Sequence, residues 1–192
     1  MKKSIIISAD DIKQTLKGYK PANSEHFHKE SAKIADKQFL KVVKESTIDT
    51  VVLMSGGAAS GKTEYVSEYL INKNFIIMDG TLLNLIGAEI KIKNSIKNNK
   101  IVQIHAVIPK SLNTAFLVFL QRKRKFSPLH FYNTHSMARK TLFEIANKYT
   151  DIPITIIESE YIKLKKTGYM KFSQIKFNNR DQLKSFPKPK LA

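Results

Sequence analysis

Short apolar segments alternate along the chain with stretches in which apolar residues recur every three or four positions. The short segments are typical of buried strands, and the periodic stretches are typical of helices with one buried face. The strand candidates are Ile5–Ile7, Thr50–Met54, Phe75–Met78, Ile101–Ile108 and Ile154–Ile157. This alternation predicts a three-layer α/β fold, in which helices cover both faces of a mostly parallel sheet of about five strands.

Three helical stretches carry apolar stripes, which we assign to the core. They are Ala32, Ala35, Phe39, Val42 and Val43 in the first, Leu112, Ala115, Phe116, Phe119 and Leu120 in the second, and Ala138, Leu142, Ile145, Ala146 and Tyr149 in the third. A further helix is expected to begin near Leu82 and to close at Asn98 and Asn99. Pro109 ends the next strand because its ring cannot donate to a ladder.

After Ser159 the pattern of alternation changes. Tyr161–Leu164 and Tyr169–Phe177 flank the sequence Lys166-Thr167-Gly168, and this arrangement predicts a β-hairpin, followed by a polar tail from Asn178. The sequence shows no repeat and no interdomain linker. With 192 residues we expect one domain over residues 1–192, in which residues 160–192 form the hairpin and tail.

The segment that carries chemistry follows the second predicted strand and reads GGAASGKT over residues 56–63. It matches G-x-x-x-x-G-K-[ST] between a strand and a helix, the phosphate-binding P-loop pattern, and predicts a P-loop kinase-like fold. Small residues let backbone amides curl round phosphate oxygens, and the following helix points its positive N-terminus at them. The nucleotide-binding candidates are Gly56, Gly57, Ala58, Ala59, Ser60, Gly61, Lys62 and Thr63.

Two P-loop residues have individual roles in this hypothesis. Lys62 would bridge the β- and γ-phosphates of the nucleotide, and Thr63 would place its hydroxyl on Mg²⁺. We therefore expect ATP or GTP together with Mg²⁺.

Asp79 follows the strand Phe75–Met78, at the edge where parallel sheets bind their ligands. Its carboxylate could hold Mg²⁺ or take the proton of an acceptor hydroxyl. The alternative is that it caps the helix expected near Leu82. We interpret Asp79 as a catalytic residue and a metal-site residue.

Other chemistry is excluded or only weakly indicated. The sequence has no cysteine, which excludes disulfides, thiolate zinc sites and a cysteine nucleophile. The strand Ile101–Ile108 has no carboxylate, and we interpret its His105 as a core residue. His26 and His28 are a weak metal signal because no further ligands accompany them.

A dense cationic run, Arg122-Lys123-Arg124-Lys125, follows the helix that ends near Leu120. Small P-loop kinases have a lid at this place, and arginine forks can stabilise charge on a transferring phosphoryl group. The alternative is a solvated basic helix end favoured by the helix dipole. We interpret the run as a lid.

These features resemble the zeta-toxin family of P-loop kinases, whose best-known members phosphorylate UDP-N-acetylglucosamine. The resemblance covers most of the chain. It rests on residues 56–63, Asp79-Gly80-Thr81, the strand, proline and helix of residues 101–120, the basic run 122–125, and His135-Ser136 opening the next helix. It implies that Arg122 and Arg124 are lid residues that contact the phosphates, and that an antitoxin protein is a partner.

One part of the resemblance stands in a different order along the chain. In the family, a strand ending in a catalytic aspartate comes after the P-loop, whereas the similar segment here, residues 5–31, precedes it. A parallel sheet tolerates such a permutation, because an inserted strand presents the same carboxyl end. The resemblance then implies that Asp10 is the base that activates the acceptor. Asp10 or Asp11 could instead cap a helix beginning at Ile12.

The charge of the chain points to anionic ligands. Lys and Arg number 33 against 16 Asp and Glu, a net charge of +17, and residues 101–192 hold 17 basic and 5 acidic side chains. Such a surface attracts polyanions. Few aromatic residues interleave the basic runs, however, and nucleic acid is therefore not the favoured partner.

No apolar run approaches the roughly 20 residues that span a bilayer, and Ile5–Ile7 is too short for a signal-peptide core. We therefore expect a soluble, cytoplasmic protein without a membrane partner.

The sequence thus predicts an ATP-dependent phosphotransferase that acts on a hydroxyl of a small anionic metabolite, with a nucleotide-sugar such as UDP-N-acetylglucosamine as the first candidate. One alternative is a polynucleotide 5′-hydroxyl kinase or nucleic-acid-binding P-loop protein, for which the basic second half argues. Another is an NTP-binding interaction module without transferase activity. Hydrolysis of the nucleotide in place of phosphoryl transfer is a further alternative.

Overall fold

The structure, a computed structural model, describes residues 2–162 and 170–176. In this part of the chain six strands form one sheet, in the order β1-β3-β2-β4-β5-β6. The strands are β1 (Ile5–Ser8), β2 (Thr50–Ser55), β3 (Ile76–Asp79), β4 (Ile101–Pro109), β5 (Ile154–Tyr161) and β6 (Met170–Ile175). The first five are parallel, and β6 is antiparallel to β5. The α/β fold is confirmed, with six strands where about five were expected.

The sixth strand belongs to the predicted hairpin. Tyr161 of β5 pairs with Met170 of β6, and Ser159 pairs with Phe172. The strands that flank the turn are therefore antiparallel neighbours, as the pattern indicates. The turn residues Lys166-Thr167-Gly168 and the tail from Asn178 lie outside the described residues.

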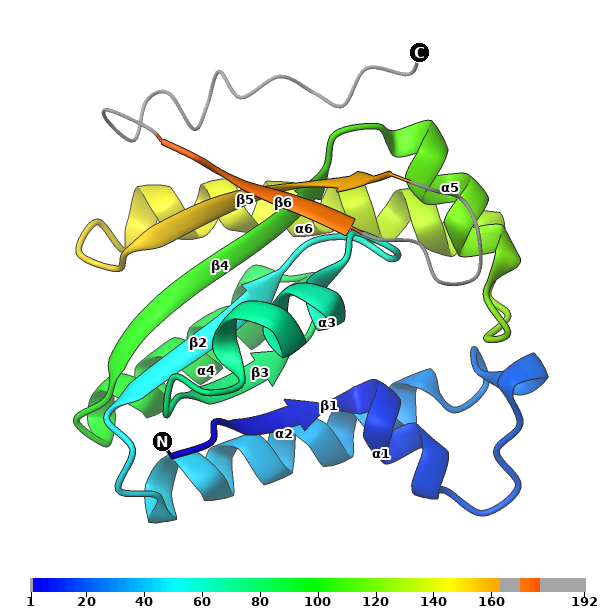
Figure 1. Cartoon of the computed structure of the whole chain (residues 1–192). Helices are drawn as coiled ribbons and strands as arrows, with labels where there is room; N and C mark the ends of the chain where they lie inside the picture. The colour runs from blue at the N-terminus through cyan, green and yellow to red at the C-terminus, as the bar shows by residue number, and fades with distance from the viewer. Residues whose placement is uncertain (1, 163–169, 177–192) are drawn as a thin grey trace.

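Helices cover both faces of the sheet (Figure 1). The helices are α1 (Ala9–Thr15), α2 (His28–Glu45), α3 (Lys62–Tyr65), α4 (Leu85–Lys97), α5 (Leu112–Gln121) and α6 (Pro128–Lys148), with a 3₁₀ turn at Pro21–Asn23 and a π-helix at Val66–Leu70 that continues α3. On one face Phe39 of α2, Ile92 of α4 and Ile145 of α6 join a core cluster with the sheet. On the other, Val66 and Leu70 pack against the sheet. None of the described helices combines the length and apolar character that a bilayer crossing needs.

Helices α4 and α6 begin at other residues than predicted, α4 from the sequence pattern and α6 from the family resemblance. Asn84 caps α4 by accepting a hydrogen bond from the Gly87 amide at 2.7 Å, and α4 therefore begins at Leu85 and not near Leu82. Ser127 caps α6, and Pro128 occupies its first turn. Both are favoured helix starts, since the cap satisfies a free amide and proline lacks one. His135 accordingly lies two turns inside α6 and does not open it.

The N-terminal segment, which precedes the P-loop in the sequence, enters the same sheet. β1 lies at the edge beside β3, parallel to it, and Ser8 stands opposite Asp79. The carboxyl ends of β1, β3 and β2 therefore meet at one edge of the sheet, where ligands of parallel α/β folds bind. The topology thus brings Asp10, which follows β1 by two residues, to the end of the sheet that carries the P-loop.

Candidate active site

The P-loop adopts a curled conformation, in which the Ala58 amide donates to Thr134 Oγ1 and the Ser60 amide donates to the Gly57 carbonyl oxygen. Gly56, Ala59 and Gly61 have φ values of 135°, 57° and 88°. A side chain on Gly56 would place its Cβ 2.3 Å from the carbonyl oxygen of Val107, and only glycine fits there. Ala59 and Gly61 are left-handed on either side of Ser60, and such an alternation forms a concave nest of amides that suits an anion. Ala59 is not a glycine, and its left-handed conformation costs about 1–2 kcal/mol.

Lys62 reaches back over this nest. Its Nζ atom donates to the carbonyl oxygens of Gly56 and Gly57, at 2.8 Å each. Burial lowers the pKa of Lys62 to about 8, although the nearby Asp79 carboxylate opposes this shift. The ammonium is therefore held at the mouth of the loop, where it can meet the oxygens of a phosphate chain.

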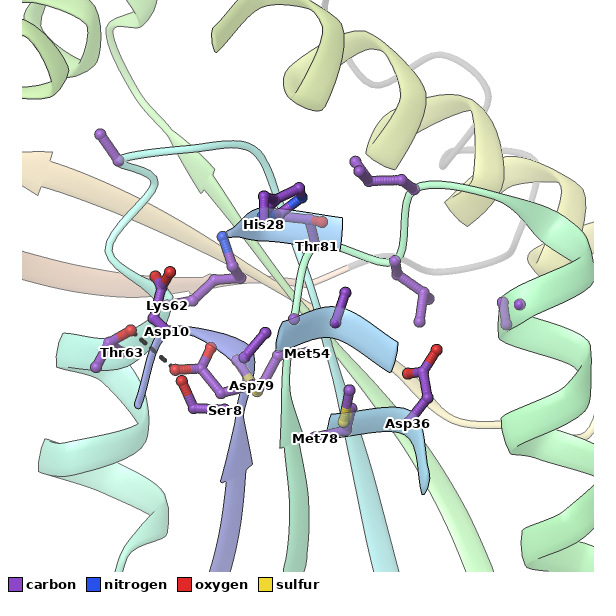
Figure 2. Close-up of a pocket in the computed structure, with 18 of the residues that line it drawn as sticks. Ser8, Asp10, His28, Asp36, Met54, Lys62, Thr63, Met78, Asp79 and Thr81 are labelled. Carbon is purple, nitrogen blue, oxygen red and sulfur yellow. Dashed lines mark hydrogen bonds between the residues drawn. The ribbon is translucent and has the colours of Figure 1, made fainter. Parts of the chain in front are cut away.

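Thr63 and Asp79 form a hydroxyl and carboxylate pair beside the loop. The Thr63 Oγ1 donates to Asp79 Oδ2 at 2.8 Å, and the two side chains face each other in Figure 2. Burial raises the pKa of Asp79, opposed by Lys62 and by the hydrogen bond from Thr63. The alternative role of Asp79 as a helix cap is wrong, because Asn84 caps α4.

This pair is also where Mg²⁺ would be held. Within the described ranges no group of three or more His, Asp or Glu side chains is arranged to bind a metal. Mg²⁺ in phosphoryl-transfer sites needs only one or two protein ligands, since substrate phosphates and waters complete its octahedron. Thr63 and Asp79 fit that pattern, whereas His26 and His28 belong to no metal-binding cluster.

Asp10 lies in the first turn of α1, and neither it nor Asp11 caps that helix. Ser8 is the cap and accepts a hydrogen bond from the Asp11 amide at 3.3 Å, so that α1 begins at Ala9 and not at Ile12. The expectation of a cap at Asp10 or Asp11 is therefore wrong, and the Asp10 carboxylate is left for other partners.

Two cations hold that carboxylate. Lys13 donates to Asp10 Oδ1 at 3.1 Å, and Arg124 forms an ion pair with Oδ2. Burial raises the pKa of Asp10, but Arg124 and Lys13 outweigh burial and keep it below its usual range. The side chain remains 44% exposed, and a substrate can therefore reach it.

The basic run 122–125 is a docked segment and not only a solvated helix end. The Lys125 amide donates to the Pro21 carbonyl oxygen at 2.9 Å, and Ser127 donates to both carboxylate oxygens of Glu25 at 3.2 Å. Together with the ion pair between Arg124 and Asp10, these bonds fasten the segment between α5 and α6 onto the N-terminal part of the chain.

An aromatic and cationic cluster supports the docked segment. Phe126 stacks on His130 with ring centroids 4.4 Å apart and meets the edge of His28 at 5.8 Å. The Lys13 ammonium lies 4.9 Å from the Phe126 ring and is fully buried. A buried ammonium needs such partners. The sequence contains one weak signal for the ion pair between Asp10 and Lys13, which is their spacing of three residues.

A cavity of about 240 Å³ brings the predicted site residues together. Its lining includes Asp10, Asp79, Arg122, Arg124 and, from the P-loop, Ala59, Gly61, Lys62 and Thr63. Figure 2 shows Asp10, Lys62, Thr63 and Asp79 gathered at one end of it. Residues scattered from position 10 to position 124 thus share one space.

The cavity continues between α2 and α4. His28, Ala32 and Asp36 line it from α2, and Lys91 lines it from α4. Asp36 and Lys91 form an ion pair of 2.7 Å across this part of the cavity. The Nδ1 atom of His28 is buried and has no hydrogen-bond partner in the part of the chain that the structure describes. The sequence pattern indicates only a core position for Ala32, although this residue also lines the cavity.

Other predicted residues lie elsewhere. Gly56 and Gly57 line a second cavity, of about 580 Å³, on the side of the loop toward α6. His105 is buried, and its Nδ1 atom lies 3.3 Å from the Tyr65 hydroxyl. Burial lowers the pKa of His105 to about 4. It is absent from the lining of the first cavity, which agrees with its interpretation as a core residue.

Comparison with known proteins bears on the fold. No family model matches the chain, and no curated protein matches it in sequence. Among solved structures it is similar to the crystal structure of AvrRxo1-ORF1:AvrRxo1-ORF2 with sulphate ions, at a TM-score of 0.51 and 9% identity. The match covers 82% of this chain and 70% of that chain. This likeness supports the three-layer kinase-like fold, and the resemblance to zeta toxins stays a prediction.

Proposed function

We propose that the protein is an ATP-dependent phosphotransferase that uses Mg²⁺ and acts on a hydroxyl group. One observation carries this proposal: the P-loop lysine, the paired Thr63 and Asp79, and Asp10 line a single cavity with two arginines of the docked segment. Such a constellation supplies phosphate binding, charge neutralisation and a proton acceptor, which are the parts that phosphoryl transfer requires.

The residues support an in-line displacement. Asp10 would accept the proton of the acceptor hydroxyl as its oxygen bonds to the γ-phosphorus, while the bond from that phosphorus to the bridging oxygen breaks and ADP leaves. Lys62 would neutralise charge that develops on the leaving side, and Arg122 and Arg124 would do so on the equatorial oxygens. Mg²⁺, held through Thr63 and Asp79, would supply further charge neutralisation.

We propose a nucleotide-sugar such as UDP-N-acetylglucosamine as the first acceptor to test. The cavity is smaller than the roughly 300–1,000 Å³ of sites that enclose a whole drug-sized ligand. It would therefore enclose the reacting groups and leave part of the two substrates outside. The cationic lining of the cavity, which includes Arg122 and Arg124, suits an acceptor that carries phosphate groups.

The test is transfer of labelled γ-phosphate from ATP, in the presence of Mg²⁺, to a panel of nucleotide-sugars, free sugars and single-stranded oligonucleotides. We expect product on a sugar hydroxyl. Release of inorganic phosphate alone would indicate hydrolysis, and ATP binding without product on any acceptor would indicate an interaction module. Failure to bind ATP at all would overturn the proposal.

The net charge of +17 supports a polynucleotide 5′-hydroxyl kinase as a second candidate. A nucleic-acid substrate would make binding steeply dependent on salt, because neutralised phosphates release counterions. Filter binding of oligonucleotides between 50 and 200 mM salt, roughly, separates the two candidates. Retention that is strong at low salt and falls steeply as the salt concentration rises favours a polynucleotide substrate, whereas no retention at moderate salt excludes that candidate.

We also propose that a partner protein regulates this chain. The resemblance to zeta toxins implies an antitoxin, and the neighbouring structure contains AvrRxo1-ORF1 together with AvrRxo1-ORF2. Co-purification of the tagged chain from its native host, followed by identification of the bound protein, tests this proposal. A stoichiometric partner that suppresses phosphoryl transfer is the expected result.

We expect the affinity for ATP to fall as pH rises above about 8, because the pKa of Lys62 is lowered to about 8. The phosphate chain favours the charged ammonium, and above that pH the free protein must take up a proton to bind. The dissociation constant should therefore rise by up to about tenfold per pH unit. Calorimetric titration from pH 7 to pH 9.5, approximately, measures it. In Lys62→Arg the charge persists, and an equal decline there would assign the effect to another group.

A further inference from the structure

Three consecutive carbonyl groups of the P-loop are held by side chains from outside the loop. Ala58 O accepts from His135 Nε2 at 2.9 Å, Ala59 O from the Tyr161 hydroxyl at 3.1 Å, and Ser60 O from the Ser159 hydroxyl at 2.7 Å. The donors lie 77, 102 and 99 residues further along the chain, on α6 and β5. The loop is thus fastened through its carbonyl groups to α6 and β5.

The orientation of these carbonyls fixes the orientation of the amides. In a planar trans peptide the C=O of one residue and the N–H of the next point in opposite directions. Carbonyls of Ala58 and Ser60 that turn toward α6 and β5 therefore turn the amides of Ala59 and Gly61 toward the other side. That is the direction in which a nest binds a phosphate.

The loop needs such fastening. Ala59 is held in a left-handed conformation with φ 57°, which a non-glycine residue keeps only where its surroundings enforce it. The His135 ring also packs against Gly57, where an added Cβ would lie 2.3 Å from it. The Ala58 amide donates to Thr134 Oγ1 at 2.9 Å, and both polar groups of Ala58 are therefore tied to α6.

We propose that His135, Ser159 and Tyr161 are positioning residues, which hold the P-loop carbonyls outward and thereby fix the loop conformation in which the Ala59 and Gly61 amides are preorganised for the phosphates of the nucleotide. This inference rests on the proposed nucleotide-dependent function. It assigns a role in nucleotide affinity to three residues that are not part of the P-loop pattern and do not line the catalytic cavity. We call these three side chains the outer clamp.

The outer clamp keeps its donors over the working pH range. Burial raises the pKa of Tyr161 to about 12, and its hydroxyl proton is therefore retained. Burial also lowers the pKa of His135 to about 4, which leaves a neutral ring. Because a carbonyl only accepts, the ring proton must lie on Nε2. The clamp is therefore a constant restraint and not a pH switch.

The experiment compares Ser159→Ala and Tyr161→Phe with a matched control, Ser95→Ala. Ser95 is fully buried in α4, as Ser159 is almost fully buried in β5, and its hydroxyl also donates to a backbone carbonyl, that of Lys91. Calorimetry measures the dissociation constant of MgADP for each protein, and thermal unfolding measures its stability. Inorganic pyrophosphate serves as a second probe that contacts only the phosphate site.

We expect each clamp variant to weaken MgADP and pyrophosphate binding by about three- to tenfold, the effect of one lost hydrogen bond, and the double variant to weaken it further. Ser95→Ala should change the affinity by less than about twofold even where its unfolding temperature falls equally. If transfer is observed, KM for ATP should rise and KM for the acceptor should not.

Several results would overturn the inference. Unchanged nucleotide affinity in both clamp variants would do so, as would an equal loss in Ser95→Ala at equal stability. If the wild type binds MgADP and the clamp variants bind it equally, only the outer clamp is wrong. If the wild type binds neither MgADP nor pyrophosphate, the proposed function fails and the clamp fails with it.

Discussion

Lys62→Ala is expected to abolish measurable phosphoryl transfer, a loss on the order of 10³-fold in kcat/KM. In the structure the Lys62 ammonium lies at the mouth of the P-loop, bonded to the carbonyl oxygens of Gly56 and Gly57. No other lysine borders this end of the cavity among the described residues. Initial rates with labelled ATP and the best acceptor of the panel measure the loss.

Lys110→Ala is the matched control. Lys110 is a surface lysine, 54% exposed, that pairs with Glu160 and lies outside the cavity. Its removal should leave the rate within about twofold, since surface ion pairs contribute little. Transfer that survives in Lys62→Ala within tenfold of wild type would contradict the assignment of Lys62, provided that thermal unfolding shows both variants folded.

Asp10→Asn is expected to lower kcat by about 10²- to 10⁴-fold and to leave the dissociation constant of ATP within a few fold. The amide keeps the size of the side chain but cannot accept the proton of the acceptor hydroxyl. Asp79→Asn should behave differently, because its carboxylate pairs with Thr63. There we expect a higher Mg²⁺ concentration for half-maximal rate, which a Mg²⁺ titration measures.

The ion pair with Arg124 calls for a second comparison. Asp10→Asn also releases Arg124, whereas Arg124→Gln removes the same ion pair and keeps the Asp10 carboxylate. A double-mutant cycle separates the two contributions. If Asp10→Asn keeps full turnover, the assignment of Asp10 is wrong, and Asp79 becomes the remaining candidate for the base.

Local patterns predict the P-loop, the strands and the hairpin. The signal of residues 56–63 is strong because each position has a physical requirement, as at Gly56, where a Cβ would meet Val107 O. Helix starts are predicted less well. Asn84 and Ser127 are favoured caps, yet the sequence pattern points to Leu82 and the family resemblance points to His135 instead. Capping chemistry decides these boundaries, and periodicity alone does not contain it.

Contacts between distant segments could not be predicted. Burial of Lys13 depends on Phe126, which is more than one hundred residues away, and the outer clamp joins residues that are 77 to 102 positions apart. Glu25 carries no motif, yet it binds Ser127. Such pairings follow from the strand order and from helix placement, which the sequence of one protein constrains only weakly.

The docking of Arg124 on Asp10 has a kinetic consequence. One guanidinium cannot neutralise an aspartate and a transferring phosphate at full strength together, and the exposed Asp10 carboxylate is therefore a weaker proton acceptor while the ion pair persists. Binding of the triphosphate would draw Arg124 away from Asp10 and free the carboxylate. An acceptor that entered first would meet this weakened base, and transfer would therefore be faster when the nucleotide is bound before the acceptor.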